Sequence, residues 1–523
     1  MDYTWVAIAF VCGFLAKQLN LPPLVGYLAA GFGLHALGVE PDASLETLSD
    51  IGVTLLLFTI GLKLNISSLF KTEIWAGASG HMAAVVLLVT LAYFILAYFG
   101  VEYFAVLDWP AAVLIGFALS FSSTVCAVKV LEENGEMRTR HGQVTIGILI
   151  IQDIAAVIFI SLATEKSPSL WALTLLALPL FRPVIIQLLQ KCGHREMLPL
   201  VGFFLAFSGG ELFEVLGLKA HLGALVVAAL VSGHEKADEL SKALLSFKDI
   251  FLIGFFLSIG FTALPSAEML ATALILVIAL PIKAGLYFLW LTRLKLRSRT
   301  SFLASLSLSN YSEFGLIVCS VSVAQGLLAK EWLVIMALAA AISFVFSSIA
   351  NIQAHNLYAR WKKFIIRFET PKRLPEDQFS QPVGATILVV GMGRVGTGAY
   401  DALCENPQQK IYGLDVDRGQ VASHRSEGRN VITADAEDPD FWTYVHLDTV
   451  NLIMLTMPRY PDIMEAIKQI HQAGYKGKTA GIALYEDEKE SLLEAGVDVV
   501  FNFYANAGAG LAEHSIHLIN QAE

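Results

Sequence analysis

The sequence predicts a multi-pass α-helical membrane protein with a C-terminal α/β domain built on a doubly wound parallel sheet. The chain of 523 residues is 55% hydrophobic and only 16% charged, with a mean hydropathy of +0.61. Between Trp5 and Tyr358 lie roughly thirteen apolar segments of about 17 to 27 residues, each near the length that spans a bilayer. Beyond them, short apolar runs alternate with helical patterns, as is typical of an α/β fold.

Three regions are predicted from this change of pattern. The membrane domain covers residues 1–360, a cytoplasmic linker covers residues 361–383, and the α/β domain covers residues 384–523. The linker is inferred from its many charges and from Pro371 and Pro375, which continue neither a helix nor a strand.

Basic residues mark alternate connections of the membrane domain, from Lys17 to the run that begins at Arg360. Because Lys and Arg are enriched in cytoplasmic loops, we expect the N-terminus outside and the C-terminal domain in the cytoplasm. The first apolar segment, Trp5–Leu15, has no small-residue cleavage site, so we expect a retained helix rather than a signal peptide.

The charges and cysteines exclude some classes of function. The formal net charge is −10 at pH 7, and the residues after Gln381 hold about ten more acids than bases. Without a basic face to neutralise phosphates, no nucleic-acid partner is expected. The five cysteines show neither metal-ligand spacing nor a disulfide pattern.

Asp153 lies near the middle of the apolar segment Gln143–Leu162, with the amide of Gln152 beside it. A charge at the bilayer centre costs about 3 kcal/mol or more, so it is kept where it faces water or a partner. We therefore interpret Asp153 as the carrier of an ion or a proton. The alternative is that it bonds a neighbouring helix and takes no part in transport.

Two other apolar segments carry polar runs that indicate broken helices. In Ala111–Val130 the run is Ser120–Thr124, and in Ser301–Val323 it is Ser307–Glu313. Unwound backbone at membrane depth survives where it lines a protected or wet cavity, and a pair of such breaks points to a midplane site. The alternative is that these hydroxyls bond to their own helix or join neighbouring helices.

Two further ionisable residues lie in apolar sequence. Lys283 follows Pro281 within Ile275–Trp290, and its ammonium needs a partner, for which Asp153 is the obvious candidate. The alternative is that Lys283 extends to the membrane interface. Glu313, at the second polar run, is a secondary candidate for the ion site; alternatively, it bonds backbone or a lysine structurally.

These residues favour an antiport mechanism. One carboxylate would hold either a proton or a small dehydrated cation, so that each displaces the other in an electroneutral exchange. Hydroxyl, amide and carbonyl oxygens are hard ligands suited to an alkali ion. The candidate residues for ion and proton binding are Asp153, Gln152, Lys283, Ser122, Ser123, Thr124 and Glu313.

Short motifs along the chain resemble those of one transporter family. They are Leu24–Gly31, Leu56–Leu62, Ser122–Thr124, Gln152–Asp153, Gly223–Ala228, Gly254–Gly260 and Ser312–Phe314. They are similar to stretches of the monovalent cation:proton antiporter-2 family, and within it to the Kef-type potassium efflux systems. The resemblance implies a homodimer in the cell (inner) membrane, with inverted repeats, crossed unwound helices and elevator-like movement. It also implies that Asp153 carries potassium and the proton, with Lys283 as its partner.

The C-terminal domain begins with a dinucleotide fingerprint. A strand at Thr386–Val390 precedes Gly391–Gly396, a G-x-G-x-x-G that opens the helix Val395–Cys404, and the next strand ends at Asp415. Such glycines let backbone approach phosphate, the helix start faces its charge, and the acid binds ribose. We expect an adenine nucleotide, AMP or NAD(H). The candidate cofactor-binding residues are Gly391, Met392, Gly393, Arg394, Val395, Gly396, Asp415, Asp435 and Ala436.

This domain resembles the RCK or KTN nucleotide-binding domains of potassium channels and transporters. The resemblance implies that Asp435 lies near the adenosine. Arg394 is placed to reach phosphate, although a solvated arginine is an equal alternative. No residue cluster indicates hydride chemistry, so we expect a regulatory nucleotide and no enzyme activity.

The cytoplasmic run Gly233–Glu239 partly matches the acidic loop through which the nucleotide domain restrains transport in Kef-type relatives. Its acids are Glu235, Asp238 and Glu239. The alternative is an ordinary charged loop. Kef-type systems are also described as gated by glutathione and its adducts, which makes these molecules and an ancillary cytoplasmic protein candidate partners.

Other functions stay open from the sequence. A nucleotide-gated cation channel would need a selectivity filter, and no Thr-Val-Gly-Tyr-Gly run is present. A sodium/proton antiporter of the same fold would use almost the same residues. A membrane-tethered oxidoreductase would need a substrate pocket, and transport of an organic anion would need a basic site.

Overall fold

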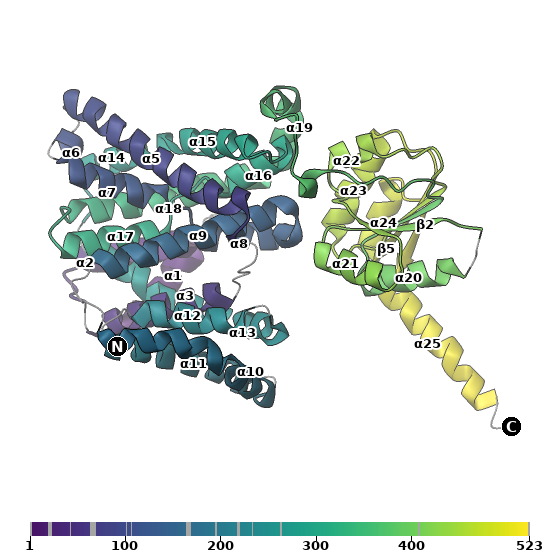
Figure 1. The fold of residues 1–523 in the computed structure, drawn as a ribbon, viewed down its shortest axis with the longest axis horizontal. Coiled ribbons are helices and arrows are strands. Elements are labelled where there is room, and N and C mark those ends of the chain that lie inside the picture. Colours follow the sequence, from purple (N-terminus) through teal and green to yellow (C-terminus); the bar gives the residue numbers. More distant parts are fainter. Residues whose placement is uncertain are drawn as a thin grey trace. The chain divides into compact units, whose positions relative to one another are not determined.

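The computed structural model describes residues 3–18, 23–41, 43–62, 69–100, 102–105, 107–163, 169–193, 196–216, 220–232, 234–261, 264–405 and 408–520. The chain forms two compact units (Figure 1). The helical unit comprises Met1–Val130 and Val144–Lys372, and the sheet unit comprises Leu131–Gln143 and Arg373–Glu523. The sheet unit therefore includes a short stretch from within the helical sequence.

Apolar helices make up most of the described helical unit. They are α1 (Tyr3–Gln18), α2 (Pro23–Ala36), α3 (Ala43–Leu62), α5 (Thr72–Tyr98), α6 (Glu102–Ala105), α7 (Trp109–Ser120), α8 (Thr124–Glu133), α9 (Arg140–Ala163), η2 (Leu170–Phe181), α10 (Arg182–Lys191), α11 (Met197–Val215), α12 (Ala220–Val231), α13 (Glu235–Gly260), α14 (Ala267–Ile278), α15 (Leu280–Arg293), α16 (Ser298–Ser307), α17 (Glu313–Ala324), α18 (Glu331–Ile352), α19 (Ala354–Ile365) and η3 (Ile366–Phe368). The ends of α8 and α9 nearest to each other extend into the sheet unit.

Five helical stretches of the described residues are long and apolar enough to cross a membrane. They are Thr72–Tyr98, Arg140–Ile160, Met197–Val215, Ala267–Arg293 and Glu331–Ile352. Shorter apolar helices include Trp109–Ser120 and Glu313–Ala324, each of which ends or begins at a break. A helical membrane-type unit is thus confirmed, whereas the number of thirteen crossings stays a prediction.

Both predicted helix breaks are present. α7 ends at Ser120 and α8 begins at Thr124, while α16 ends at Ser307 and α17 begins at Glu313. The polar runs interrupt the helices because their side chains bond to backbone groups that a continuous helix would use internally.

Hydroxyl side chains start the second helix after each break. Ser123 Oγ accepts a hydrogen bond from the Cys126 N–H at 3.1 Å, and Ser312 Oγ accepts one from the Phe314 N–H at 3.0 Å. Such N-terminal caps satisfy N–H groups that have no helical partner.

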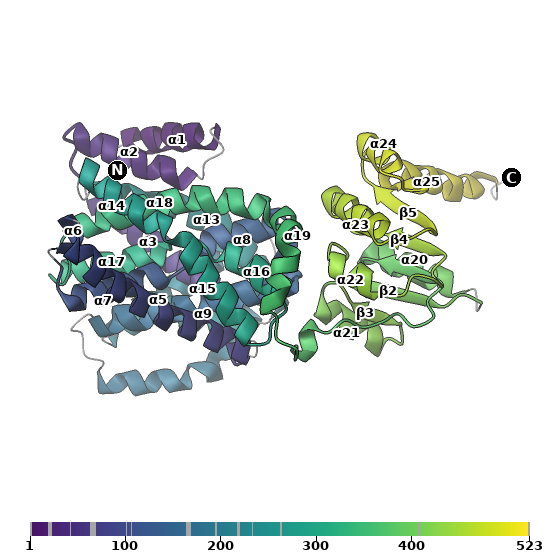
Figure 2. The ribbon, with the colours of Figure 1, turned by 90° about the horizontal axis from the view of Figure 1, so that it is seen from above.

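The helices of the helical unit pack in two groups. In the first, α3 lies against α12 and α13, α11 lies against α12, and α2 lies against α1 and α13. Figure 2 shows α1 and α2 together at one edge of this unit. In the second, α5 contacts α7 and α15, α7 contacts α17, and α18 contacts α14 and α17. Of the helices next to the breaks, α7 and α17 belong to this second group, and α16 contacts its members α15 and α18.

The sheet unit contains a parallel sheet of six strands in the order β3-β2-β1-β4-β5-β6. Its elements are η1 (Glu136–Arg138), η4 (Pro375–Asp377), β1 (Ile387–Val390), α20 (Arg394–Cys404), β2 (Ile411–Asp415), α21 (Arg418–Ser426), β3 (Val431–Thr433), α22 (Pro439–Tyr444), β4 (Leu452–Leu455), α23 (Tyr460–Gln472), β5 (Lys478–Ala483), α24 (Glu486–Glu494), β6 (Val499–Asn502) and α25 (Phe503–Asn520). The strand order reverses between β1 and β4, which confirms the predicted doubly wound sheet.

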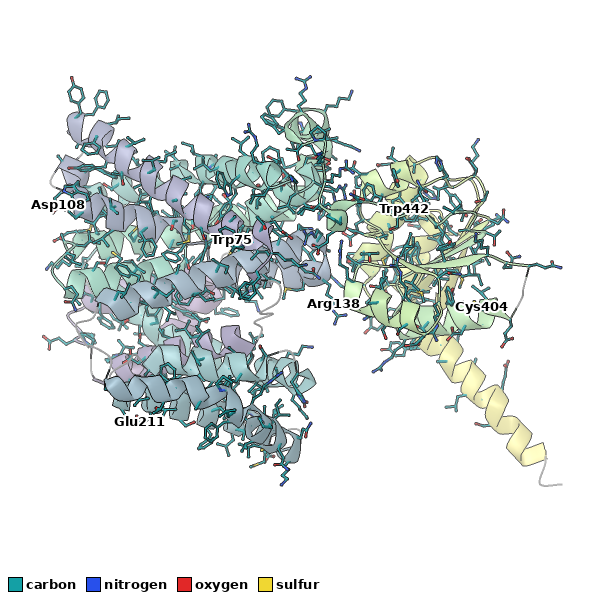
Figure 3. The ribbon with its side chains drawn as sticks, in the orientation of Figure 1. Trp75, Asp108, Arg138, Glu211, Cys404 and Trp442 are labelled. Atoms are coloured by element: carbon teal, nitrogen blue, oxygen red, sulfur yellow. The ribbon has the colours of Figure 1, made fainter. Side chains whose placement is uncertain are left out.

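Trp442 anchors the core of the sheet unit beside the strand ends (Figure 3). It is fully buried next to Phe441, and its Nε1–H donates to the Ala436 carbonyl oxygen at 2.7 Å. Because a buried indole N–H needs an acceptor, this bond fixes the loop after β3. The same loop carries the predicted residues Asp435 and Ala436.

The loop between β1 and α20 has the backbone that its glycines predict. Gly391 has a φ of +93°, in the left-handed region that favours glycine. Gly393 has open space where a side chain would begin. At Gly396 a Cβ atom would lie 1.8 Å from the Gly391 carbonyl oxygen, so α20 packs directly on the loop.

We expect Gly396→Ala to destabilise the sheet unit by about 3 kcal/mol, because the added methyl group overlaps backbone at Gly391. Gly398→Ala is the matched control, since this position on α20 has open space and the substitution should stabilise by about 0.5 kcal/mol. Hydrogen exchange of peptides from β1 and α20 in the full chain measures both effects. Equal protection in the two variants would contradict the packing argument.

Candidate functional site

Asp153 points into the protein and not toward lipid, since it is only 1% exposed. The Thr124 hydroxyl donates to its carboxylate, 3.3 Å from Oδ1 and 3.1 Å from Oδ2. Thr124 is the first residue of α8, and the start of a helix favours negative charge. The structure thus brings the predicted carboxylate to one predicted hydroxyl at the end of a broken helix.

The two helix breaks touch one another. Ser122 Oγ donates to the Leu308 carbonyl oxygen at 2.7 Å, and the Ser123 N–H donates to Asn310 Oδ1 at 2.6 Å. Leu308 and Asn310 lie in the break between α16 and α17. The crossing of two unwound segments, implied by the family resemblance, is therefore confirmed.

Lys283 bonds to this crossing and not to Asp153. Its Nζ donates to the carbonyl oxygens of Leu119 at 3.1 Å, Phe121 at 2.6 Å and Asn310 at 2.8 Å. The predicted ion pair is wrong for the described structure, because the ammonium is used by carbonyl groups that the breaks leave without helical N–H partners. Interface snorkelling is excluded too, since Lys283 is 4% exposed.

Gln152 bonds to the first break. Its Oε1 accepts from the Ser122 N–H at 3.0 Å, and its Nε2 donates to the Ser120 carbonyl oxygen at 3.1 Å and to Tyr287 Oη at 2.6 Å. The amide therefore positions backbone. The ring of His81 stacks on the ring of Tyr287 with 3.2 Å between centroids, and this stacking holds the Tyr287 ring in place for its hydrogen bond with Gln152.

The predicted ion ligands thus divide into two kinds. Asp153 and Thr124 face each other, whereas Gln152, Ser122 and Ser123 use their polar groups to build the crossing. Glu313 is the first residue of α17 and is 2% exposed, so a second buried acid lies at the other half-helix.

Sequence reasoning missed two residues of the crossing, Asn310 and Tyr287. Asn310 lies within the second polar run, and its Nδ2 donates to Ser347 Oγ at 3.2 Å. Tyr287 follows Lys283 by four residues, which places both on one face of α15. That spacing is a signal that could have identified it.

A cavity of about 250 Å³ lies between the two helix groups. Ser49 and Ser258 line one side, on α3 and α13, while Ile160 and Ser320 line the other, on α9 and α17. Ile160 follows Asp153 by seven residues, which places both on one face of α9 about 10 Å apart. Asp153 itself does not line this partly polar cavity, so its carboxylate is separated from the cavity wall at Ile160 by about two turns of α9.

A second cavity, of about 590 Å³, lies in the sheet unit at the carboxyl ends of the strands. Ligands of open α/β sheets bind in this position, at the point where the strand order reverses. The predicted cofactor residues that line it are Gly391, Gly393, Arg394, Val395, Asp415, Asp435 and Ala436.

Met392, Gly396 and Asp415 shape the glycine loop. Asp415 Oδ2 accepts from the Met392 N–H at 2.8 Å, and its Oδ1 accepts from the Asp417 N–H at 2.8 Å. The Met392 side chain is 1% exposed and packs in the core. Met392 and Gly396 therefore pack the glycine loop against the core and against α20. Gly393 has open space at its Cβ position, which leaves room for a phosphate to approach its backbone.

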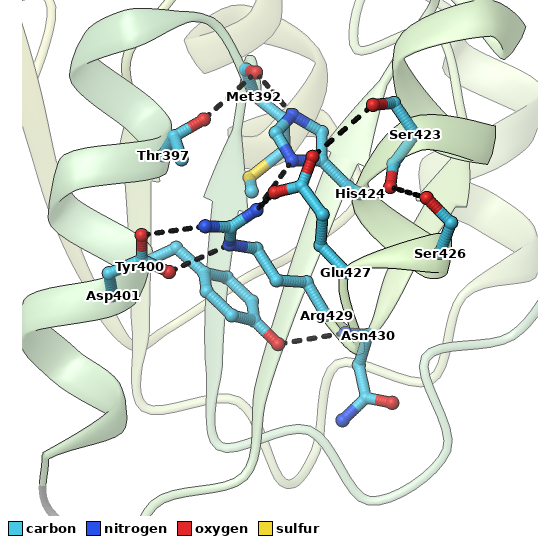
Figure 4. Close-up of polar contacts among 10 residues, drawn as sticks. All are labelled: Met392, Thr397, Tyr400, Asp401, Ser423, His424, Ser426, Glu427, Arg429 and Asn430. Carbon is cyan, nitrogen blue, oxygen red and sulfur yellow. Dashed lines mark hydrogen bonds and ion pairs between the residues drawn. The ribbon is translucent and has the colours of Figure 1, made fainter.

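A polar network also holds this loop (Figure 4). His424 Nε2 lies 2.9 Å from the Met392 carbonyl oxygen, and Arg429 Nη1 lies 3.2 Å from His424 Nδ1. Because the Arg429 guanidinium can only donate, His424 Nδ1 accepts its hydrogen bond. His424 Nε2 therefore carries the ring hydrogen and donates it in the hydrogen bond to the Met392 carbonyl oxygen. Arg429 also donates to both carboxylate oxygens of Asp401, at 2.7 and 2.9 Å, which lowers the pKa of Asp401.

The acidic run predicted as a loop begins a helix instead. α13 starts at Glu235, and the His234 side chain accepts from the Lys236 N–H at 3.2 Å. Acids favour a helix start because they complement its dipole. Lys236 Nζ also bonds Glu239 at 2.8 Å. Gly233 and the side chains of Glu235 and Asp238 lie outside the described residues.

Residues 6–351 match the transmembrane sodium/hydrogen exchanger family, and residues 387–503 match the TrkA-N domain. The first match spans well over half of the chain. The chain belongs to the sodium/hydrogen exchanger family. This exchanger is a cation/proton antiporter with a C-terminal TrkA-N domain, and it is not an enzyme.

Two curated relatives are similar to the exchanger over most of its length. The putative cation/proton antiporter YbaL of Escherichia coli (strain K12) is 25% identical over 540 residues, 95% of this chain and 93% of YbaL. The glutathione-regulated potassium-efflux system protein KefC of Shigella flexneri serotype 5b (strain 8401) is 27% identical over 451 residues, 82% of this chain and 70% of KefC. The solved sodium proton antiporter MjNhaP1 from Methanocaldococcus jannaschii is 13% identical, with 70% of this chain and 96% of that chain covered and a TM-score of 0.47.

Lys283→Met should destabilise the exchanger's helical unit by about 3 to 5 kcal/mol, because it leaves buried carbonyl groups without a donor. Arg293→Met, at the exposed end of the same helix, is the control and should cost less than about 1 kcal/mol. Unfolding in detergent measures both. In a double-mutant cycle, the stability effects of Lys283→Met and Asp153→Asn should be close to additive. A large coupling energy between the two substitutions would instead support an ion pair between Lys283 and Asp153.

Burial raises the pKa of Asp462, in the exchanger's second cavity, to about 6; Arg459 opposes the shift, whereas Asp435 and Glu136 add to it. The folded state therefore binds more protons than the unfolded state between about pH 4 and 6, and stability should fall as the pH rises through that window.

Asp462→Asn should accordingly stabilise the sheet unit by roughly 2 kcal/mol at pH 7.5, with the gain shrinking toward zero near pH 4. Asp448→Asn, on an exposed loop, is the control and should change little at either pH. Hydrogen exchange of α23 peptides in the full chain measures the effect. A gain that does not depend on pH would contradict the assignment.

Proposed function

We propose that the protein is a potassium/proton antiporter, which exchanges potassium efflux for proton entry by elevator-type alternating access. The observation that carries the proposal is the contact of Asp153 with Thr124 at the crossing of two broken helices. A single buried carboxylate binds either a proton or a cation, so the binding of one releases the other.

Potassium is supported by the donor atoms and by one relative. Carboxylate and hydroxyl oxygens suit an alkali ion, and KefC is named a potassium-efflux system. Glu313, a buried acid at the other half-helix, is a further candidate ligand of the ion. Sodium is the second candidate, because the matching family is that of sodium/hydrogen exchangers.

Alternating access is supported by the two helix groups and the cavity between them. Movement of the group that carries Asp153 against α3 and α13 would open and close the route that passes Ser320 and Ser258. We place this movement in a homodimer in the cell (inner) membrane, with the N-terminus outside and the TrkA-N domain in the cytoplasm.

Regulation by an adenine nucleotide, AMP or NAD(H), completes the proposal. Gly391 and Gly393 would receive the phosphate, Asp415 would bind the ribose, and Asp435 would lie near the adenosine. The start of α13, with Glu235, Asp238 and Glu239, would restrain transport. Because KefC is named glutathione-regulated, glutathione or its adducts are proposed partners, together with an ancillary cytoplasmic protein.

Asp153→Asn should reduce cation-dependent proton movement to the level of empty liposomes, because an amide holds neither the proton nor the charge that binds the cation. Glu211→Gln is the matched control, since Glu211 is an exposed acid on α11 (Figure 3) and should leave transport unchanged. Fluorescence dequenching in proteoliposomes, with potassium, sodium, rubidium and lithium and with or without AMP or NADH, measures the exchange.

The outcomes separate the candidates. A larger response to potassium than to sodium supports the proposal, and the reverse order supports the sodium exchanger. Exchange at the wild-type rate in Asp153→Asn would overturn the assigned carrier. Cation flux at channel-like rates without a proton gradient would favour a gated channel.

A further inference from the structure

The segment Leu131–Gln143, which comprises the end of α8, the start of α9 and the residues between them, belongs to the sheet unit, and we call it the connection. It lies within the sequence matched by the exchanger family and outside residues 387–503, which match the TrkA-N domain. The sheet unit of this chain is therefore larger than its TrkA-N domain. The added piece joins the two helices that carry Thr124 and Asp153.

Charged contacts attach this connection to the rest of the sheet unit. Arg138 Nη1 bonds Asp417 Oδ2 at 2.8 Å, next to the start of α21 (Figure 3). Arg140 Nη1 lies 2.7 Å from Glu376 Oε2, and its Nε lies 3.8 Å from Asp377 Oδ1. The Asp377 side chain is 1% exposed, so this second attachment is buried and costly to break.

Backbone packing gives a further attachment. Gly135 has a φ of +72°, and a Cβ atom there would lie against the Arg459 guanidinium. A residue with a side chain would therefore be strained and would displace Arg459. The connection thus fits the sheet unit closely at both Gly135 and Arg138.

Three residues of the connection, Gly135, Arg138 and Thr139, line the cavity together with the glycine loop. The Arg138 side chain is 63% exposed, so its guanidinium has room to turn. The Gln420 side-chain amide forms two hydrogen bonds when its oxygen and nitrogen are assigned so that both have partners. In that orientation Oε1 accepts from Arg138 Nη1 at 3.1 Å, and Nε2 donates to the Met392 carbonyl oxygen at 3.2 Å. One side chain thus separates Arg138 from the loop that would receive phosphate.

We propose that Arg138 is a nucleotide-binding residue, supplied by the membrane-domain connection, which binds the phosphate of the nucleotide and exchanges Asp417 for it. This inference rests on the proposed nucleotide regulation. The planar guanidinium matches phosphate in a bidentate geometry, and the monophosphate of AMP or the diphosphate of NAD(H), each with about two charges, competes well with one carboxylate. Asp417 keeps partners when Arg138 leaves, because it also accepts from the Gly419 N–H at 2.8 Å.

The same contact gives the nucleotide a route to the ion site. Arg140 begins α9, and Asp153 follows thirteen residues later, which is about 20 Å along a continuous helix. Thr124 begins α8, the helix on the other side of the connection. A nucleotide that draws Arg138 toward its phosphate therefore pulls on both residues that meet at the ion site.

Binding is tested by calorimetry of the full-length protein with AMP and with NADH. Arg138→Ala should weaken the binding of the preferred nucleotide about tenfold, and Arg138→Lys should recover part of that loss. Lys468→Ala, an exposed cation on α23 outside the cavity lining, is the control and should bind as the wild type does. Hydrogen exchange of α21 peptides checks that the sheet unit stays folded in each variant.

The failures are distinguishable. If the wild type binds neither nucleotide, both the proposed regulation and this inference fail. If the wild type binds and folded Arg138→Ala binds equally well, the inference alone is overturned.

The route is tested with Arg140→Gln, because Arg140 attaches the connection without lining the cavity. Nucleotide affinity should stay within about threefold of the wild type, whereas the change in transport caused by saturating nucleotide should fall at least by half. An undiminished nucleotide effect on transport in this variant would overturn the α8–α9 route.

Discussion

Backbone groups set free by two helix breaks are the constraint on which the ion site depends. A break inside a membrane exposes carbonyl and N–H groups that cost several kcal/mol each if they are left unbonded. Here the Lys283 ammonium bonds carbonyl groups from both breaks, while Gln152 bonds a carbonyl and an N–H of the first. The crossing is stable because side chains replace its missing helical hydrogen bonds.

In the proposed mechanism, this arrangement leaves the Asp153 carboxylate accessible to a proton or a cation. If Lys283 paired with the carboxylate, a cation would have to displace an ammonium already bound there. Because the ammonium is used by the crossing, Thr124 is the contact that orients the carboxylate, and in the proposed mechanism a proton and an alkali ion compete for its one charge. In the proposed mechanism, Lys283 and Gln152 do not bind the ion but hold the two helix breaks in position through these hydrogen bonds.

Much of this could be predicted from sequence, because local patterns carry it: the apolar lengths, the polar runs that break them, the acid at membrane depth and the glycine loop with Asp415 after the next strand. The partner of Lys283 could not, since the direction of its side chain depends on how α15 packs against both breaks. The contacts of Gln152 with the first break could not be predicted for the same reason. Arg138 was missed because it contacts Asp417 from 279 positions away in the sequence, and local sequence patterns do not predict such long-range contacts.

The central claim is that one carboxylate exchanges one proton for one cation, and proton release on cation binding tests it most directly. Purified protein in weakly buffered detergent solution, followed with a pH-sensitive dye, should release close to one proton per chain when potassium is added. The account predicts that this release disappears in Asp153→Asn and persists in Glu211→Gln. Potassium binding without proton release, or full release in the absence of Asp153, would contradict it.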